Sequence, residues 1–224
     1  MGPVGLCCSQ CQGIEMEFNR KTAASQLRRY RKRGAGGTTR VLIDALEAMG
    51  VDGLTLLDIG GGIGIIQHEL LMVGVMRATG VDASTAYLEA AREEAARQGH
   101  GDRVAFHHGD FAALAAQIAP ADVVTLDRVI CCYHDMGALV GLSAARARKL
   151  YGVVYPRDTW WNRMGIALVN FIMRVRRRPF RTFVYPTDAV EAVIVRNGLA
   201  RQFHRQTLVW QVVVYGRSPA AQAP

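Results

Sequence analysis

The stretch LLDIGGGIGIIQHEL, residues 56–70, joins an apolar run to a predicted helix through four glycines within five residues. A glycine inside a helix or strand costs about 0.5–1 kcal/mol relative to alanine, so four of them at one junction need a reason. A glycine-rich turn after the first strand lets a ligand approach the main chain, at the sheet edge where open α/β folds bind ligands. The spacing Gly60-x-Gly62-x-Gly64 departs from the dinucleotide pattern Gly-x-Gly-x-x-Gly, which would need glycine in place of Ile65. The stretch therefore predicts a binding loop of another kind.

Strands and helices alternate around this loop. Strands are predicted at residues 54–60, 77–84, 103–110, 121–129 and 151–156, and helices at residues 63–72, 86–98, 111–117 and 137–150. Such alternation with short links predicts a parallel sheet with right-handed crossovers. After an amphipathic segment at 159–175 and a helix at 187–196, strands at 199–206 and 207–216 are close enough to pair antiparallel. The predicted fold is a doubly wound α/β domain whose mostly parallel, seven-stranded sheet ends in an antiparallel hairpin.

The remaining segments flank this domain. Residues 1–13 lack periodicity and predict an irregular arm, and residues 14–33 predict a polar helix that ends in a glycine-rich link. Thr38 or Thr39 can cap the next helix, which would run to Met49. We expect an N-terminal arm and cap helix over 1–37, the α/β domain over 38–216 and a disordered tail over 217–224.

Composition narrows the class of protein. Half of the 224 residues are hydrophobic, which excludes a disordered chain. The N-terminus shows no secretion leader, and the apolar stretch at 164–173 is too short to span a bilayer, so a cytoplasmic protein without a transmembrane segment is expected. Five cysteines form no secreted disulfide framework. The net charge of +8 permits nucleic acid, an anionic membrane surface or an acidic small molecule as partner and selects none of them.

Two acidic residues follow the glycine loop at successive strand ends. Asp82 comes 24 residues after Asp58, and a carboxylate there can accept hydrogen bonds from both hydroxyls of a ribose. Asp110 ends the third strand, where it could accept from the amine of an adenine, and Phe111 could pack on the adenine ring. A nucleoside-containing cofactor is therefore expected.

With these residues in order, the chain resembles the class I S-adenosylmethionine-dependent methyltransferases. The motifs DIGGGIG, VDAS, GDF and ADVVTLDRV resemble the successive motifs of this family and occur in the same order. The final helix and hairpin look like the family's seventh-strand ending. The resemblance implies S-adenosyl-L-methionine as cofactor, with Asp127 and Arg128 facing the reacting methyl group. The cofactor-binding positions that it implies are Asp58, which would orient the loop, Gly60, Gly62 and Gly64 around the methionine part, Asp82 at the ribose, Asp110 with Phe111 at the adenine, and Tyr30 on the cap helix over the sulfonium.

Methyl transfer from a sulfonium is an in-line displacement, so the protein supplies proximity, orientation and, for some acceptors, a base. The candidate catalytic residues are Asp127, Tyr133 and His134, of which His134 is best suited to accept a proton near neutral pH. The segment LDRVICCYHD is also similar to that of magnesium-protoporphyrin IX O-methyltransferases, although Cys132 stands where that family has a histidine. The sequence favours methylation of a small-molecule acceptor, most plausibly on oxygen.

The sequence is less specific about the residues that bind the methyl acceptor. Arg178 and Arg181 are expected to bind a carboxylate or phosphate of the acceptor, and Trp160 to form part of an apolar wall. At helical spacing, apolar residues such as Trp160 are more often part of the core. Enzymes of this fold that methylate base amines usually carry Asn or Asp followed by Pro-Pro at the end of the fourth strand. This chain has LDRV there, so nucleic acid is disfavoured as the acceptor.

Two further alternatives remain open, and the oligomeric state is not indicated. The chain could bind the cofactor without turnover, as a partner or sensor. A thiol or metalloid acceptor becomes possible if Cys7, Cys8 and Cys11 converge with Cys131 and Cys132. The spacing Cys8-x-x-Cys11 suits zinc, but no second such pair is present, so no metal is expected.

Overall fold

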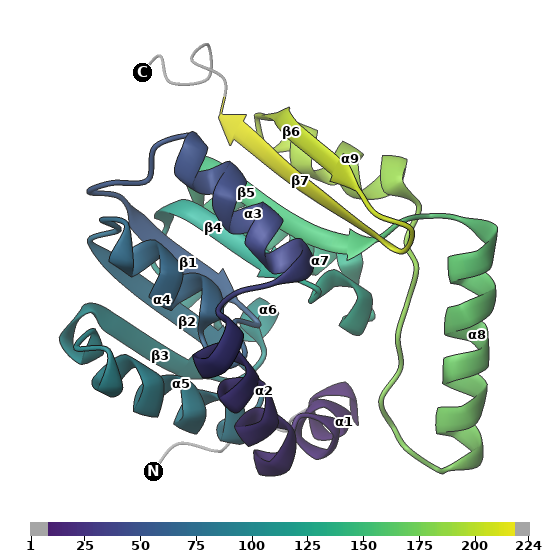
Figure 1. Ribbon diagram of the computed structural model, residues 1–224. Coiled ribbons are helices and arrows are strands. Elements are labelled where there is room, and N and C mark those ends of the chain that lie inside the picture. Colours follow the sequence, from purple (N-terminus) through teal and green to yellow (C-terminus); the bar gives the residue numbers. More distant parts are fainter. Residues whose placement is uncertain (1–8, 218–224) are drawn as a thin grey trace.

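A computed structural model describes residues 9–217 of the chain, with side chains from Gly13 onward. Its centre is a seven-stranded sheet in the order β3-β2-β1-β4-β5-β7-β6, in which only β7 runs antiparallel to its neighbours (Figure 1). The strands are β1 Thr55–Ile59, β2 Arg77–Asp82, β3 Val104–His108, β4 Ala121–Asp127, β5 Ala147–Pro156, β6 Leu199–Gln206 and β7 Trp210–Arg217. This order confirms the predicted doubly wound sheet with its antiparallel hairpin.

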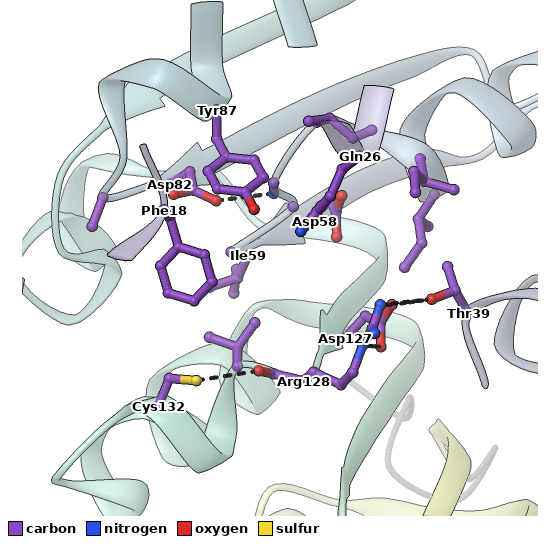
Figure 2. Close-up of a pocket in the computed structure, with 18 of the residues that line it drawn as sticks. Phe18, Gln26, Thr39, Asp58, Ile59, Asp82, Tyr87, Asp127, Arg128 and Cys132 are labelled. Atoms are coloured by element: carbon purple, nitrogen blue, oxygen red, sulfur yellow. Dashed lines mark hydrogen bonds and ion pairs between the residues drawn. The ribbon is translucent and has the colours of Figure 1, made fainter. Parts of the chain in front are cut away.

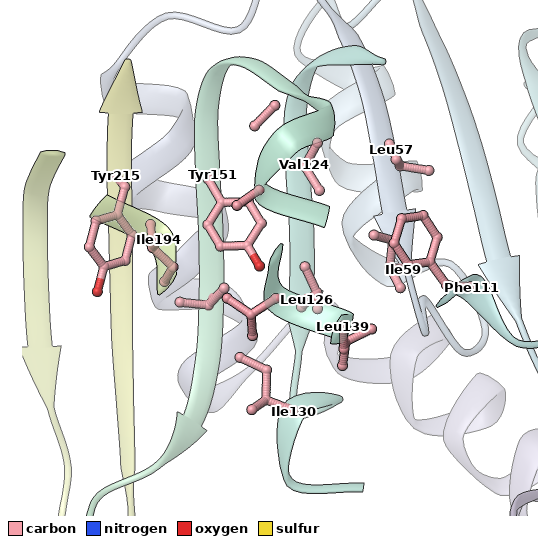
Figure 3. Close-up of a cluster of buried hydrophobic side chains, with 14 of the residues drawn as sticks. Leu57, Ile59, Phe111, Val124, Leu126, Ile130, Leu139, Tyr151, Ile194 and Tyr215 are labelled. Carbon is pink, nitrogen blue, oxygen red and sulfur yellow. The ribbon is translucent and has the colours of Figure 1, made fainter. Parts of the chain in front are cut away.

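Helices cover both faces of the sheet (Figure 1). They are α1 Ser9–Glu17, α2 Arg20–Arg33, α3 Gly37–Ala48, α4 Ile65–Met72, α5 Thr85–Arg97, α6 Phe111–Leu114, α7 Met136–Arg146, α8 Trp160–Val175 and α9 Thr187–Arg196. Side chains alternate between the two faces along each strand, so Leu57 and Val124 pack with α7 and α9, whereas Leu56 and Val123 pack with α3 and α4. Figure 3 shows the first of these two cores, which includes Phe111 and Tyr151. The sheet is therefore buried on both sides.

The end of α7 corrects one sequence prediction. Residues 147–150 were expected to continue a helix, but they belong to β5, where Ala147 pairs with Ala121 and Leu150 with Val123. The two side chains are buried in this strand. Pairing with a central strand outweighs the helix propensity of the intervening arginine and lysine, because it satisfies backbone groups that would otherwise be buried unpaired.

The N-terminal region also differs from prediction. Residues 9–13, predicted to be irregular, lie in α1, and the predicted helix over 14–33 is interrupted at Asn19. Asn19 caps α2, because its side chain accepts hydrogen bonds from the N–H groups of Lys21 and Thr22. Helix α3 begins at Gly37 with Gly36 at its N-cap, rather than with a threonine cap.

The C-terminal boundaries differ by a few residues. Strand β7 begins at Trp210, because residues 207–209 form the turn that is closed by the hydrogen bond from Thr207 N to Trp210 O (2.8 Å). Arg217, predicted to start the tail, ends β7, and its guanidinium donates to the carbonyl of Ala147. Residues 1–8 of the predicted arm and 218–224 of the predicted tail lie outside the described residues.

Candidate active site

A cavity of about 660 Å³ lies at the carboxyl edge of the sheet, over the ends of β1, β2 and β4 (Figure 2). Side chains of α1 and α2 line it from one side, and residues 180 and 182 line it from another. Its volume is within the range of small-molecule pockets, and its position is where doubly wound sheets bind ligands. Most of the residues that the sequence singles out for cofactor binding line this cavity.

The glycine loop forms the floor of the cavity. Gly60, Gly62 and Gly64 have φ values of +63°, +58° and +80°, which side chains other than glycine rarely adopt. Gly61, which sequence reasoning missed, is needed for space, because a Cβ there would lie 2.3 Å from the Asp58 carboxylate and 2.6 Å from the Gln67 amide. The loop therefore turns sharply into α4 and leaves its main chain open to the cavity.

Asp58 holds this loop from below. It is 1% exposed, and its carboxylate accepts from Thr125 Oγ1 at 2.7 Å and from Gln67 Nε2 at 3.0 Å. These bonds join β1 to β4 and to the first turn of α4. Burial raises the pKa of Asp58 to about 7, and the nearby charges of Asp127 and Asp82 act in the same direction. The buried carboxyl thus ties the strand before the loop to the helix after it.

Asp82 braces the same loop from the second strand. Its carboxylate accepts from the backbone N–H of Gly62 at 2.9 Å and from that of Ser84 at 2.8 Å. Figure 2 shows Asp82 at the cavity, beside the ring of Tyr87. Burial raises the pKa of Asp82, although the two backbone donors oppose this shift.

Asp110 lies at the third strand end and is joined to Tyr133. One of its oxygens caps α6 by accepting from Ala112 N at 3.0 Å, and the other accepts from Tyr133 Oη at 2.9 Å. Phe111 is buried in the core beside it and also lines the cavity. Tyr133, predicted to act at the methyl group, is thus tied to the acid predicted to hold adenine.

Asp127 and Arg128 form a polar cluster at the end of β4 (Figure 2). Thr39 Oγ1 donates to Asp127 Oδ2 at 2.5 Å, and Arg128 Nε donates to Asp127 Oδ1 at 3.1 Å. Arg128 has φ +61°, a left-handed conformation that costs a non-glycine residue roughly 1–3 kcal/mol and is concentrated at functional sites. Thr39, on α3, lines the cavity although no sequence motif points to it.

Helix α2 covers another wall of the cavity. Tyr30 lines it and donates from Oη to Glu69 Oε1 at 3.0 Å, and burial raises its pKa. Arg29 and Arg33 line the cavity from the same helix. They belong to a basic run that is visible in the sequence, but helical phase alone does not reveal which of its members turn inward.

Five predicted site residues lie outside the cavity lining, and Gly64 of the glycine loop is one of them. His134 is exposed and stacks on Tyr133, and Trp160 is 67% exposed at the start of α8. Arg178 pairs with Glu17 at 2.5 Å, and Arg181 donates to the main-chain carbonyls of Arg178 and Phe180. Phe180 and Thr182 line the cavity from the segment where the two arginines were expected to act.

The structure describes only two of the five cysteine side chains whose convergence was considered. Cys131 and Cys132 line the cavity with their sulfur atoms 3.7 Å apart. Cys7 and Cys8 lie outside the described residues, as does the side chain of Cys11. Among the side chains that the structure describes, no group of three or more His, Cys, Asp or Glu could hold a metal ion.

Comparison with known proteins identifies the domain built around this cavity. Residues 56–148 match the model of a methyltransferase domain family. The match runs from the first strand through the glycine loop to the start of β5. Residues 56–148 therefore form a methyltransferase domain.

Relatives and solved structures agree with the methyltransferase domain. The chain is 29% identical over 127 residues to a ribosomal protein L11 methyltransferase of Yersinia pseudotuberculosis, which covers 54% of this chain and 43% of that protein. The matched region thus spans less than half the length of that relative.

Two solved structures share the fold of the methyltransferase domain over nearly the whole chain. Magnesium protoporphyrin IX methyltransferase from Synechocystis PCC 6803, crystallised with bound SAH, has a TM-score of 0.69 at 18% identity, and the match covers 93% of this chain and 100% of that one. An O-methyltransferase family protein from Burkholderia thailandensis has the same TM-score and identity, with 92% of this chain and 63% of that one covered. At these identities the likeness establishes the fold.

Proposed function

We propose that the domain transfers a methyl group from S-adenosylmethionine to an oxygen atom of a small-molecule acceptor. The observation that carries the proposal is the cavity itself, where the glycine loop and four carboxylates meet at the ends of four neighbouring strands. These carboxylates belong to Asp58, Asp82, Asp110 and Asp127.

The residues present suit this cofactor. S-adenosylmethionine carries a sulfonium and an ammonium, and the carboxylates that line the cavity are opposite in charge to both groups. When bound, the cofactor supplies a methyl group activated by the positive sulfur. Asp82 would hold the ribose, Asp110 with Phe111 the adenine, and the open main chain of the glycine loop the methionine part.

The protein's own contribution is orientation and proton transfer. Asp127 lines the cavity next to the loop, and its contacts with Thr39 and Arg128 fix its position. We propose that the Asp127 carboxylate accepts the proton that an acceptor hydroxyl loses during methyl transfer. Tyr30 and Phe18 would exclude water from the side of the cavity next to the glycine loop. His134, the base expected from sequence, is exposed and is not part of the cavity lining, so we do not assign it this role.

The cavity wall favours a small acceptor with an anionic group. Arg29 and Arg33 supply cations on α2, while Ile14, Phe18 and Phe180 supply apolar surface. An apolar acceptor that bears a carboxylate would match both features. The magnesium protoporphyrin and O-methyltransferase neighbours support a small acceptor by fold analogy, whereas the L11 relative acts on a protein.

Calorimetric titration with S-adenosylmethionine and S-adenosylhomocysteine tests the cofactor site. We expect micromolar binding by the wild type and at least tenfold weaker binding by Asp82→Ala, because a charge-assisted pair of hydrogen bonds to the ribose is lost. Asp82→Asn is the control for loop integrity, because it retains one acceptor for the Gly62 N–H. Absence of wild-type binding would contradict the proposal.

A radiolabelled methyl-transfer screen tests turnover. Carboxylates, phenols and thiols are offered in turn, and Asp127→Asn is expected to lower kcat roughly a hundredfold on an oxygen acceptor with little change in cofactor affinity. Tight cofactor binding without product across all acceptors would instead favour a binding protein without turnover.

A further inference from the structure

Helix α8 presents its polar side to the protein. Asn162 is 7% exposed and donates to the carbonyls of Arg157 at 2.8 Å and Val209 at 2.9 Å. Asn170, about two turns further on, donates to Thr182 O at 2.7 Å and accepts from Thr182 N at 3.0 Å. Figure 1 shows α8 standing outside the two helix layers that cover the sheet. The helix is therefore held by these amide hydrogen bonds and by the half-buried side chains of Ile166 and Met173, and not by its main apolar stripe.

The apolar stripe of α8 faces outward instead. Five large side chains recur every three or four residues along it, and each is at least 60% exposed: Trp160, Met164, Leu168, Phe171 and Val175. Trp161 and Ile172, at the edge of the stripe, are 39% and 41% exposed. A helix of a globular domain normally buries such a stripe against the core. A contiguous apolar face of this kind marks a binding surface for a protein or a membrane.

Positive charge is concentrated at the C-terminal end of this face. The segment 159–182 contains six arginines and no acidic residue. Arg163 and Arg178 have acidic partners, Asp158 and Glu17. Arg174, Arg176 and Arg177 are exposed and form no ion pair within the described part of the chain.

The backbone of Arg177 has an unfavourable left-handed conformation. It has φ +53° just after the helix, at the position where glycine is easiest. The bonds from Arg177 N to Arg174 O and from Arg178 N to Met173 O close the helix end around it. The cationic end of the helix is therefore built with a residue that the backbone does not favour.

We propose that α8 docks on the surface of an anionic lipid bilayer, with its apolar stripe in the interface and its arginines on the lipid phosphates. Tryptophan, long apolar residues and arginine on one helix are the composition of an interfacial helix. No helix within the described residues has the length and hydrophobicity of a membrane span. The inner side of α8 is held by the protein, so the helix would lie along the bilayer surface with its outer side in contact. If two copies of the protein paired through this face, the arginines of the two helices would repel each other, because neither segment contains an acidic residue. An anionic lipid surface would instead neutralise their charge.

Docking requires no methyl transfer and is tested without it. Purified protein is sedimented with vesicles of phosphatidylcholine alone and with vesicles of phosphatidylcholine and phosphatidylglycerol at roughly 3:1. We expect binding to the anionic vesicles that weakens with added salt. Leu168→Ser with Phe171→Ser should weaken binding by at least tenfold, because two apolar side chains no longer enter the interface. Arg174→Ala with Arg176→Ala should weaken it by at least tenfold, at about fivefold per charge.

Matched controls come from the opposite side of the molecule. Met72→Ser removes a side chain that is 57% exposed at the end of α4, and Arg148→Ala removes an exposed arginine at the other end of β5. Both variants should bind anionic vesicles as the wild type does. Because the α8 side chains are exposed, their variants should keep the wild-type circular dichroism and thermal transition.

Three outcomes would overturn the proposal. The first is failure of the wild type to bind anionic vesicles at low salt, and the second is equal binding by the α8 variants and the wild type. The third is a dimer in light scattering that the Leu168→Ser and Phe171→Ser substitutions convert to monomer, which would assign the stripe to a second copy.

Discussion

Helices α4 and α8 both reverse the usual distribution of polar and apolar side chains, but in opposite ways. At the start of α4, Gln67 and His68 are buried at 1% and 0% exposure beneath the glycine loop. Along α8, Phe171 and Leu168 are exposed at 63% and 60%. Burying a polar group costs free energy unless the group forms hydrogen bonds. An exposed apolar stripe is also unfavourable in water unless another surface covers it. Gln67 supports the glycine loop through its hydrogen bond to Asp58, whereas the apolar stripe of α8 is the surface for which we propose contact with an anionic bilayer.

The largest expected difference between the two helices is in the stability that their leucines contribute. Leu70, on α4, is fully buried in the core beneath the sheet, and Leu70→Ala should reduce the free energy of unfolding by about 2–5 kcal/mol. Leu168→Ala on α8 should change it by less than about 0.5 kcal/mol, because the side chain is already in solvent. Urea denaturation of both variants measures the contrast. A comparable loss in Leu168→Ala would mean that the α8 stripe is covered.

An intermediate effect is expected at the buried acid beneath the α4 loop. The folded-state pKa of Asp58 is raised from 3.8 to about 7, so the stability present at low pH is lost as pH rises through this window, because the folded state must release a proton it favours. Asp58→Asn removes this loss and should unfold with roughly 2 kcal/mol more free energy than the wild type at pH 8.

At about pH 3 the two proteins should differ little, since the Asp58 carboxyl is then mostly protonated in both the folded and the unfolded state. Gln67 Oε1 is buried without a partner, so the Gln67 amide can turn to accept from the new asparagine. Thermal denaturation across this pH range checks the result. An equal shift at both pH values would show that packing, rather than ionisation, separates the variants.

The smallest effect sharpens the comparison from the α8 side. Arg177→Gly relieves a left-handed conformation and should stabilise the fold by about 1 kcal/mol, while it weakens binding to anionic vesicles about fivefold. Arg176→Gly removes the same charge at φ −78°, where glycine brings no relief, and should lower stability slightly. Thermal denaturation and vesicle sedimentation of the two variants separate backbone strain from charge. Equal thermal shifts would refute the strain at Arg177.

Prediction from sequence worked where local pattern and chemistry coincide. The amphipathic segment, the helix at 187–196 and the strand at 199–206 have the bounds expected from periodicity, to within a residue. The glycine loop and the strand-end acids Asp58, Asp82 and Asp110 meet at one cavity, because parallel strands bring their carboxyl ends to one edge. Prediction was poorer for contacts between distant segments. Nothing near Thr39 in sequence indicates that its hydroxyl reaches Asp127 across 88 residues.

The sequence by itself determined the order of strands and helices, the binding loop and the acids around it, because hydrophobic period and glycine spacing are local properties of the chain. Only the tertiary structure decided which face of each helix is covered. Trp160 and Phe171, which the sequence allows as core or as an acceptor wall, are exposed instead, because Asn162 and Asn170 bond to carbonyl groups and fix α8 with its apolar stripe outward. The same folding turns Arg29 and Arg33 toward the cavity and leaves Arg178 and His134 outside it. A side chain's environment depends on what packs against it, and that information is not local.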